Sequence, residues 1–317
     1  MSRDVNLGST MTPRLHPHAS SSGKVILVGE HAVVYGQPAL AAGLPDGLEL
    51  WASPLDRRTD ATRLVIPEWQ LDLVLTPDND HPVARATLEV LGFCDGPLTG
   101  WRITGTSRLP SRAGCGSSAA LSVALARLVL GDEAAPADII EASLAGERVF
   151  HGNPSGIDNL VATTGGIVRF VKGQPAAEIA VKAPLPLLVV PTGIPRSTAA
   201  QVTKVRERLA RLPSIVRPIL DAIGHATDDA ISAINSCNYN ILGEIFTVTH
   251  ELLSSLGVSC PALDSLQADA LSAGALGAKL TGAGGGGCLL VLPPADPSPV
   301  IDAMRARGLE PLAVEVR

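Results

Sequence analysis

The chain has 317 residues, of which 25 are Lys or Arg and 31 are Asp or Glu, so its net charge is −6 at pH 7. Hydrophobic residues make up 46% and charged residues 18%, which excludes an intrinsically disordered chain. The acidic balance disfavours a nucleic-acid-binding protein. No run of about 18 apolar residues occurs, so we expect no membrane span. The N-terminal segment is polar and lacks a short apolar region, so we expect no secretory signal.

The first half of the chain mixes strands and helices. Residues 1–22, rich in Ser, Pro and Thr, are expected to form a disordered leader. Alternating apolar residues between turn residues predict strands at 24–28, 39–42, 48–51, 63–66, 69–75, 98–104, 166–171 and 178–181. The segments between 48 and 75 are expected to pair as an antiparallel meander. Apolar residues at helical spacing predict helices at 83–91, 117–130 and 138–150.

The second half is predicted to be mainly helical. The expected helices are 198–212, 215–236, 240–256, 261–273 and 298–307, and the expected strands are 187–191, 276–280, 288–292 and 311–316. The Pro-rich stretch at 183–186 is the predicted boundary between an N-terminal domain, 23–184, and a C-terminal domain, 185–317. Because strands and helices do not alternate strictly, the predicted fold class is α+β.

Two glycine-rich segments are candidates for anion binding. In LPSRAGCGSSAA, glycines follow a strand, and Ser117 and Ser118 open a helix whose free N–H groups and dipole suit a polyphosphate. The alternative is ordinary serine capping of that helix. The second segment, KLTGAGGGGC, satisfies the dinucleotide pattern formally but leads into a strand rather than a helix. We therefore interpret it as a hairpin loop over an anionic ligand.

Three charged residues are candidates for chemistry, each with a structural alternative. Glu147 lies on an apolar helical stripe, which indicates either a metal ligand or a buried salt bridge. Asp158 follows a Gly- and Pro-rich turn and is either a helix cap or a proton acceptor for phosphoryl transfer. Lys24 begins a strand and, taken alone, is expected to be solvated.

Taken in order, GEHAVVYGQPALA, PSRAGCGSSAA, GERVFHGNPSGIDN and KLTGAGGGGCLLVL resemble the motifs of the GHMP family of small-molecule kinases. The third is similar to the members of the family that act on mevalonate. The resemblance spans residues 23–292 and implies a two-domain GHMP kinase fold with the active site in the cleft between the domains. It also implies transfer of the ATP γ-phosphoryl group to the 5-hydroxyl of mevalonate, in isoprenoid precursor biosynthesis.

The resemblance implies roles for individual residues. Asp158 is the expected catalytic base and Lys24 its neighbouring cation, while Ser118 and Glu147 are expected to hold Mg²⁺. The expected nucleotide-site residues are Ser107, Arg112, Ala113, Gly114, Cys115, Gly116, Ser117 and Ser118. The expected substrate-site residues are Glu30, His31, Arg196, Thr198 and Thr281. Mevalonate and ATP are the expected partners, without nucleic acid or membrane, and a homodimer is left open.

Five cysteines without a CxxC pair disfavour a disulfide framework or a zinc site and favour a reducing cytoplasm. Cys115 stands where the family usually has Leu, and Arg112 where a small residue is common. A thiol near a helix N-terminus is open to acidification, so we expect ATP to slow alkylation of Cys115 if it lines the phosphate site.

Two other functions remain as alternatives. One is a sister kinase of the same family that acts on phosphomevalonate, homoserine or a sugar. The other is a non-catalytic nucleotide-binding protein on the same scaffold. The presence of Lys24, Glu147 and Asp158 together disfavours the second.

Overall fold

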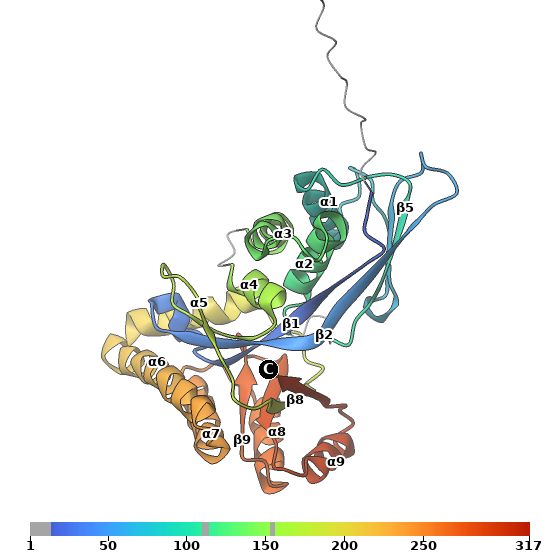
Figure 1. Ribbon diagram of the computed structural model, residues 1–317. Helices are drawn as coiled ribbons and strands as arrows, with labels where there is room; N and C mark the ends of the chain where they lie inside the picture. Colours follow the sequence, from blue (N-terminus) through green and yellow to red (C-terminus); the bar gives the residue numbers. More distant parts are fainter. Residues whose placement is uncertain (1–13, 110–113, 153–155) are drawn as a thin grey trace, which may run out of the picture.

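The computed structural model describes residues 14–109, 114–152 and 156–317, which form two domains, each built on its own sheet (Figure 1). The first sheet has the order β4-β3-β5-β2-β6-β7, with β1 paired to β2. Its strands are β1 (His18–Val28), β2 (Ala39–Pro54), β3 (Arg63–Ile66), β4 (Leu71–Val74), β5 (Trp101–Thr106), β6 (Ile167–Phe170) and β7 (Ala177–Ile179).

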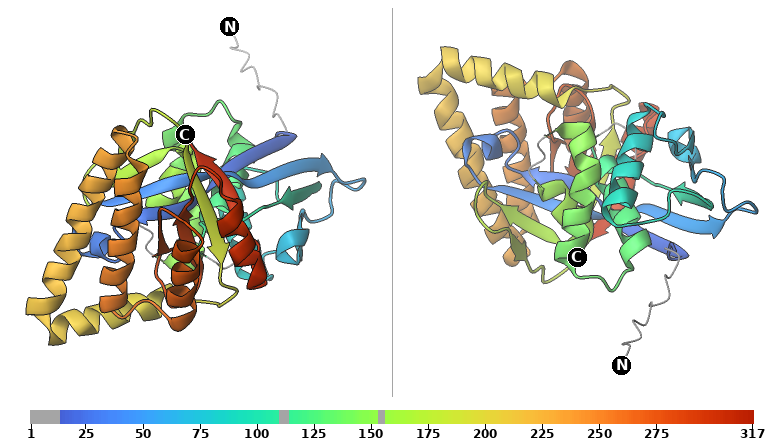
Figure 2. Two further views of the ribbon diagram at one scale, coloured as in Figure 1. Left: turned by 90° about the horizontal axis from the view of Figure 1, so that it is seen from below. Right: turned by 90° about the horizontal axis from the view of Figure 1, so that it is seen from above.

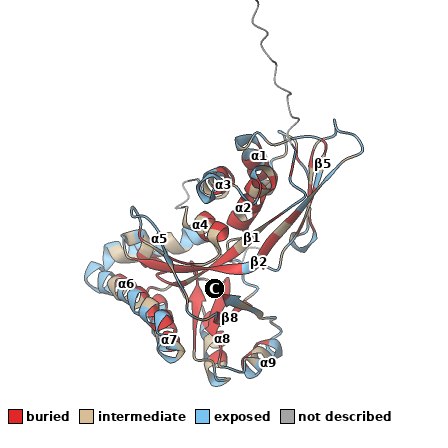
Figure 3. Cartoon of the chain, in the orientation of Figure 1, coloured by how far each residue is buried: buried red, intermediate tan, exposed pale blue. Residues whose placement is uncertain are grey.

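Helices cover one face of this sheet, above β1 and β2 in Figure 1. They are α1 (Pro82–Phe93), α2 (Ser117–Leu130), α3 (Pro136–His151) and α4 (Ile157–Thr164). Two short 3-10 helices, Ala32–Tyr35 and Pro67–Trp69, lie in the connections. The central helix, α2, is buried along most of its length because it packs against β1, β2 and the three other helices (Figure 3).

The second domain places an antiparallel sheet of order β11-β8-β10-β9 beneath the first sheet. Its strands are β8 (Leu185–Pro191), β9 (Gly277–Thr281), β10 (Cys288–Leu292) and β11 (Leu312–Val316). Its helices are α5 (Thr198–Arg211), α6 (Pro213–Asn235), α7 (Tyr239–Ser255), α8 (Pro261–Ser272) and α9 (Ser298–Ala306). Figure 2 shows α6 and α7 packed side by side.

Strands β8, β9 and β10 of the second sheet are buried on both faces, and this joins the two domains. On β8, Leu187 and Val189 belong to the large core shared with the first domain, whereas Leu188 and Val190 face the core formed with the second domain's helices. Because side chains alternate along a strand, a continuous apolar run serves both cores at once.

The N-terminal boundary of the fold differs from the expected disordered leader. Residues 1–13 lie outside the described part, but β1 begins at His18, inside the predicted leader. Ala19 and Ser21 are buried, and His18 pairs with Trp51 of β2. A serine-rich segment has low strand propensity, and its long-range pairing with β2 overrides that local preference.

The α+β class is confirmed. The predicted meander is correct for β3 and β4, which pair antiparallel, but wrong for the segment at 48–51, which lies in β2 and is separated from β3. Strand β5 inserts between β2 and β3 and runs parallel to β3. The chain reaches this position after α1, which supplies the crossover that a parallel pair needs. The two strands predicted at 39–42 and 48–51 are parts of the single strand β2. Among the described residues, no helix is both long and apolar enough to cross a membrane.

Candidate active site

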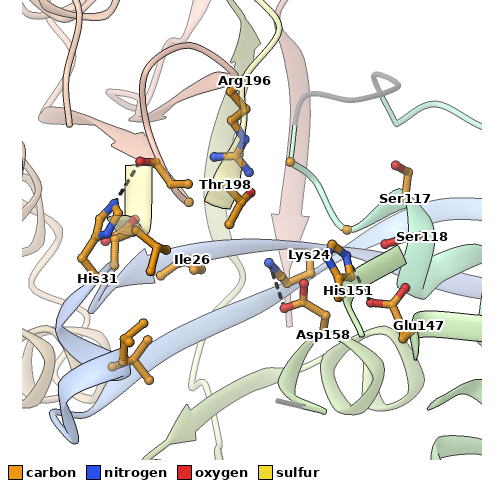
Figure 4. A pocket seen from close by; sticks show the side chains of 18 of the residues that line it. Lys24, Ile26, His31, Ser117, Ser118, Glu147, His151, Asp158, Arg196 and Thr198 are labelled. Atoms are coloured by element: carbon orange, nitrogen blue, oxygen red, sulfur yellow. Dashed lines mark hydrogen bonds and ion pairs between the residues drawn. The ribbon is translucent and has the colours of Figure 1, made fainter. Parts of the chain in front are cut away.

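A cleft of about 750 Å³ opens between the two domains, and both contribute to its walls. From the first domain come the end of β1, the start of α2, the end of α3 and the start of α4 (Figure 4). From the second come the segment around Arg196 and the glycine loop between β9 and β10. The cleft therefore lies where the motifs of the sequence converge.

A lysine–aspartate ion pair lies on the first-domain wall. Lys24 Nζ, on β1, is 2.9 Å from Asp158 Oδ1, on the first turn of α4. The Lys24 side chain is only 8% exposed, whereas that of Asp158 is 31% exposed. Figure 4 shows the two groups pointing toward each other within the cleft. The lysine is thus fixed behind a carboxylate that a ligand can reach.

The loop that precedes α2 is shaped to receive an anion. Gly114 and Gly116 have φ angles of 84° and 74°, in the left-handed region that glycine adopts without strain. The carbonyl of Cys115, between them, accepts a 2.8 Å hydrogen bond from the Lys24 amide. Gly116 caps α2 without a side chain, so the N–H groups of the first helical turn are left for a ligand or water.

Glu147, on α3, has the environment of a metal ligand. Its burial raises the pKa of the carboxyl to about 7, and nearby Asp158 adds to this, while a hydrogen bond from Ser118 and the charge of Lys24 act in the opposite direction. Its Oε1 is buried and has no hydrogen-bond partner among the described residues. Burying a carboxylate oxygen without a partner is costly, and a divalent cation between Glu147 and Ser118 would remove that cost.

Few side chains that could bind a metal surround Glu147. No group of three or more His, Cys, Asp or Glu side chains suited to a metal gathers within the described ranges. His151 Nε2 lies 3.6 Å from Glu147 Oε2, one helical turn further along α3 (Figure 4). A site with one carboxylate and one hydroxyl fits Mg²⁺, which is commonly bound by one or two carboxylates together with substrate phosphates and water.

Arg196 supplies a cation from the opposite wall. Its Nη1 donates a 3.1 Å hydrogen bond to the Thr281 carbonyl. The guanidinium lies against Gly114 and Gly282, where a Cβ atom would come within 1.5 and 2.5 Å of its nitrogens. Thr198, the first residue of α5, lines the same wall. Two glycines, one from each domain, thus make room for one arginine beside the loop 114–116 that precedes α2, which we call the phosphate loop.

Of the expected substrate-site residues, Thr281 does not line the cleft. Its hydroxyl accepts a 3.0 Å hydrogen bond from the Ile26 amide and donates one of 3.0 Å to the Ile26 carbonyl, so it ties β9 to β1. Glu30 borders the cleft, but its side chain is fully buried in an ion pair with Lys279 of β9. His31 Nε2 lies 2.9 Å from the Ala283 carbonyl, at the edge of the cleft.

Only some of the expected nucleotide-site residues line the cleft. Gly114, Gly116, Ser117 and Ser118 line the cleft. Ser107 lines neither the cleft nor the second cavity described below, because its hydroxyl donates to the Gly47 carbonyl and accepts from the Leu109 amide. The Cys115 thiol is fully buried and points away from the cleft, into the core. Arg112 and Ala113 lie outside the described residues.

Three residues of the site had no role assigned from the sequence. Lys279 is the partner of Glu30, and its position within the KLTGAG motif was the available signal. His151 stands four residues after Glu147, a spacing that predicts proximity on a helix. Asn159 lines the cleft and donates to the Ser143 hydroxyl at 2.8 Å. Asn159 closes the segment GERVFHGNPSGIDN, and its place in that motif was the available signal.

A second cavity, of about 550 Å³, adjoins the start of α2. It shares Ser117 and Ser118 with the main cleft, and Trp69, Leu121 and Phe150 give it apolar walls. An apolar pocket beside an anion-binding helix start has the form of a nucleotide site, with a flat base in the pocket and phosphates at the helix.

The chain matches two family models, each over one segment, and known proteins over nearly its whole length. The model of the GHMP kinases N terminal domain matches residues 81–166, and that of the GHMP kinases C terminal matches residues 230–309. Mevalonate kinase from Pyrococcus furiosus is 35% identical over 324 residues, covering 94% of this chain and 95% of that protein. Mevalonate kinase from Bos taurus is 34% identical over 353 residues, covering 90% and 88%.

Solved structures agree with these matches. The crystal structure of L. major mevalonate kinase in complex with R-mevalonate has a TM-score of 0.83 at 27% identity, covering 96% of this chain and 97% of that one. Mevalonate kinase from Methanococcus jannaschii shares the fold, with a TM-score of 0.82 at 24% identity and coverage of 98% and 99%. The expected two-domain fold is thereby confirmed, and the chain belongs to the GHMP kinase family of ATP-dependent small-molecule kinases.

Proposed function

We propose that this protein is a mevalonate kinase, which transfers the γ-phosphoryl group of ATP to the 5-hydroxyl of mevalonate. The relatives at about one-third identity over almost the full length are mevalonate kinases. The observation that carries the proposal is the Lys24–Asp158 pair, 2.9 Å apart, in the same cleft as the anion-binding start of α2. A proton acceptor thus shares a cavity with a phosphate-binding loop, as hydroxyl phosphorylation requires.

In the proposed reaction, Asp158 accepts the proton of the mevalonate hydroxyl as that oxygen attacks the γ-phosphorus. Lys24 holds the carboxylate in place and offsets the negative charge that gathers around the transferring group. The first-turn N–H groups of α2 bind the phosphates from one side, and Arg196 approaches from the other. Phosphoryl transfer needs positioning and charge neutralisation above all, and these groups supply both.

Glu147 and Ser118 are the residues we assign to Mg²⁺. The unpartnered Oε1 of Glu147 and the position of Ser118 at the start of α2 support the assignment. When bound, the ion neutralises charge on the nucleotide phosphates. The nucleotide base is assigned to the second cavity, against Trp69, because that cavity opens onto the same two serines.

We also propose that the enzyme works in the cytoplasm. All five cysteines are free thiols, including the buried Cys115 and Cys288. Free thiols of this number are typical of a reducing compartment.

A substrate panel tests the proposed function. ADP release would be measured with mevalonate, phosphomevalonate, homoserine and galactose, each with and without Mg²⁺. The expected result is Mg²⁺-dependent turnover of mevalonate alone. Turnover of one of the other three substrates, with none on mevalonate, would retain the kinase activity and overturn the substrate. Undiminished turnover after removal of divalent cations would overturn the metal assignment.

A further inference from the structure

Two buried thiols from different domains face each other behind the phosphate loop. Cys115 precedes α2, Cys288 is the first residue of β10, and their sulfur atoms are 3.6 Å apart. Both residues are fully buried. They are separated by 173 positions in the chain, so only the closed arrangement of the two domains brings them together.

The position of each thiol is set by the contacts around it. Cys288 begins β10 on the face that packs against the first domain, and it pairs with Thr281 of β9. The Thr281 hydroxyl is bonded to Ile26 of β1, while the Cys115 carbonyl accepts from Lys24 on the same strand. One strand, β1, therefore anchors both sulfur-bearing segments.

The two thiols are not equivalent. The pKa of the Cys115 thiol is lowered, first by the hydrogen bond with Cys288 and then by the charges of Lys24 and Arg196, against the effect of burial. The pKa of Cys288 is raised, first by the same hydrogen bond and then by burial. Because Cys115 directly precedes the N-terminus of α2 and its carbonyl contacts Lys24, we assign it as the attacking thiolate and Cys288 as the second thiol.

We propose that Cys115 and Cys288 are a redox modification site, at which a peroxide drives formation of a disulfide that joins the two domains and impairs the phosphate loop. The Cys115 thiolate attacks one oxygen of hydrogen peroxide, the O–O bond breaks and hydroxide leaves, giving a sulfenic acid. The Cys288 sulfur then attacks the Cys115 sulfur, and the sulfenic oxygen leaves as water with the Cys288 proton. Overall, two thiols become one disulfide and one peroxide becomes two waters.

The bond would alter the site because of where the sulfurs lie. A disulfide requires the sulfur atoms to approach to about 2.0 Å, well below their present 3.6 Å separation. Cys115 stands between Gly114 and Gly116, both of which line the cleft, so its movement displaces the phosphate-binding backbone. Both chain neighbours of the buried Cys115 line the cleft, and the cleft is therefore the proposed route of peroxide to the thiol.

The test uses the full-length reduced protein, treated with increasing hydrogen peroxide and then denatured and alkylated. The expected product carries two fewer alkyl groups per chain than the untreated protein, and its digest contains a peptide with Cys115 linked to one with Cys288. In parallel, ATP affinity measured by calorimetry and the rate of ADP release are each expected to fall by about tenfold or more. Dithiothreitol is expected to restore both.

Variants separate this pair from the other thiols. Cys288→Ala is expected to abolish the linked peptide and the dithiothreitol-reversible loss. Cys237→Ser, at an exposed free cysteine, is expected to leave both unchanged. The linked peptide is mapped on the unaltered protein, so this test remains valid even if the Cys288 variant folds poorly.

Two results would overturn the proposal. One is the absence of the linked peptide at peroxide concentrations that oxidise Cys237. The other is a linked protein whose ATP affinity and rate equal those of the reduced form. The rate of ADP release rests on the proposed function, but the linked peptide and the ATP affinity do not depend on which hydroxyl is phosphorylated. Failure of the redox proposal is therefore distinguishable from failure of the proposed function.

Discussion

Asp158 combines two properties that a proton acceptor needs in this site, since a ligand can reach its carboxylate and Lys24 holds it in place. Its carboxylate is partly exposed to the cleft, while the lysine that holds it is nearly buried. The lysine amide is in turn hydrogen-bonded to the phosphate loop. Lys24 therefore contacts both Asp158, its proposed catalytic partner, and the loop that precedes α2.

Replacement of Asp158 by Asn is expected to lower kcat by about a thousandfold, because the amide cannot accept the hydroxyl proton. ATP affinity, measured by calorimetry, is expected to stay within about twofold, since the phosphates bind at α2. Asp72→Asn is a matched control, because Asp72 forms a surface ion pair with Arg63 far along the first sheet. Substantial turnover by Asp158→Asn would show that another group takes the proton.

At the scale of the elements, the site depends on glycines that let two loops approach Arg196. Gly114 has a φ of 84° and its Cβ position is occupied by the Arg196 guanidinium, at 1.5 Å. Gly173, in a first-domain turn, has nearly the same φ, 83°, but nothing lies within 4 Å of its Cβ position. The two positions thus differ in their surroundings and not in backbone conformation.

This difference predicts different outcomes for two alanine variants. Gly173→Ala is expected to cost only the strain of a left-handed alanine, about 1–2 kcal/mol, with unchanged kinetics. Gly114→Ala is expected to carry the same strain and also to displace Arg196, raising the KM for ATP by about tenfold or more. Urea unfolding and steady-state kinetics on both variants check this, and equal kinetics for the two would contradict the assigned role of Gly114.

A buried histidine joins three elements beside the cleft. His250 of α7 accepts a 3.0 Å hydrogen bond from the Leu280 amide at Nδ1, so its proton is on Nε2, 3.1 Å from Asp264 of α8. Burial lowers the pKa of His250, and the charge of Lys279 adds to this, while Asp264 and Glu251 oppose it. The folded protein therefore favours the neutral imidazole.

The sign of the resulting pH dependence follows from linkage. The pKa of His250 in the folded protein lies below its value of about 6.5 in the unfolded chain. The contribution of His250 to the free energy of unfolding is therefore complete above pH 6.5 and is lost as the pH falls toward the folded pKa. Burial lowers the pKa of His31 as well, so both contribute with the same sign. His250→Asn is expected to be less stable at pH 8 but to lose less stability between pH 7.5 and 5.5, as measured by urea unfolding. An unchanged pH slope in the variant would contradict the assignment.

For the whole molecule, a buried ion pair holds the two domains together. Glu30, after β1, and Lys279, on β9, are both fully buried, and Lys279 Nζ also donates to the Leu280 carbonyl at 2.7 Å. A buried pair contributes little net stability over an apolar substitute, but removal of one partner leaves an uncompensated charge. Separation of the two domains would therefore break this pair and leave both charges without a partner.

Lys279→Met is expected to lower the free energy of unfolding by about 3–5 kcal/mol, because Glu30 is left buried without its cation. The double variant Glu30→Gln with Lys279→Met is expected to recover much of this loss. Arg305→Met is the control, since its pair with Glu310 is exposed and contributes about 0–1 kcal/mol. Additive losses in the double variant would show that the two residues do not act as a pair.

The sequence by itself determined the local elements and the chemical character of the site. Helix α2 and strand β10 have the predicted bounds, because apolar spacing within one segment decides them. Glu147 and Asp158 were identifiable as candidates because both lie in one contiguous segment, GERVFHGNPSGIDN. Such elements and motifs depend on residues that are close together in the chain, and these can be read directly from the sequence.

Only the tertiary structure decided which residues meet across the two domains. It pairs Glu30 with Lys279, 249 positions apart, and Cys115 with Cys288, and it turns Thr281 from an expected substrate contact into a tie to β1. It also extends β1 into a segment whose composition predicted disorder. These outcomes depend on burial and hydrogen bonding between segments that are distant in the chain. The free energy of these contacts exceeds the local conformational preference of each segment, and neither segment shows them as a periodic pattern of residues.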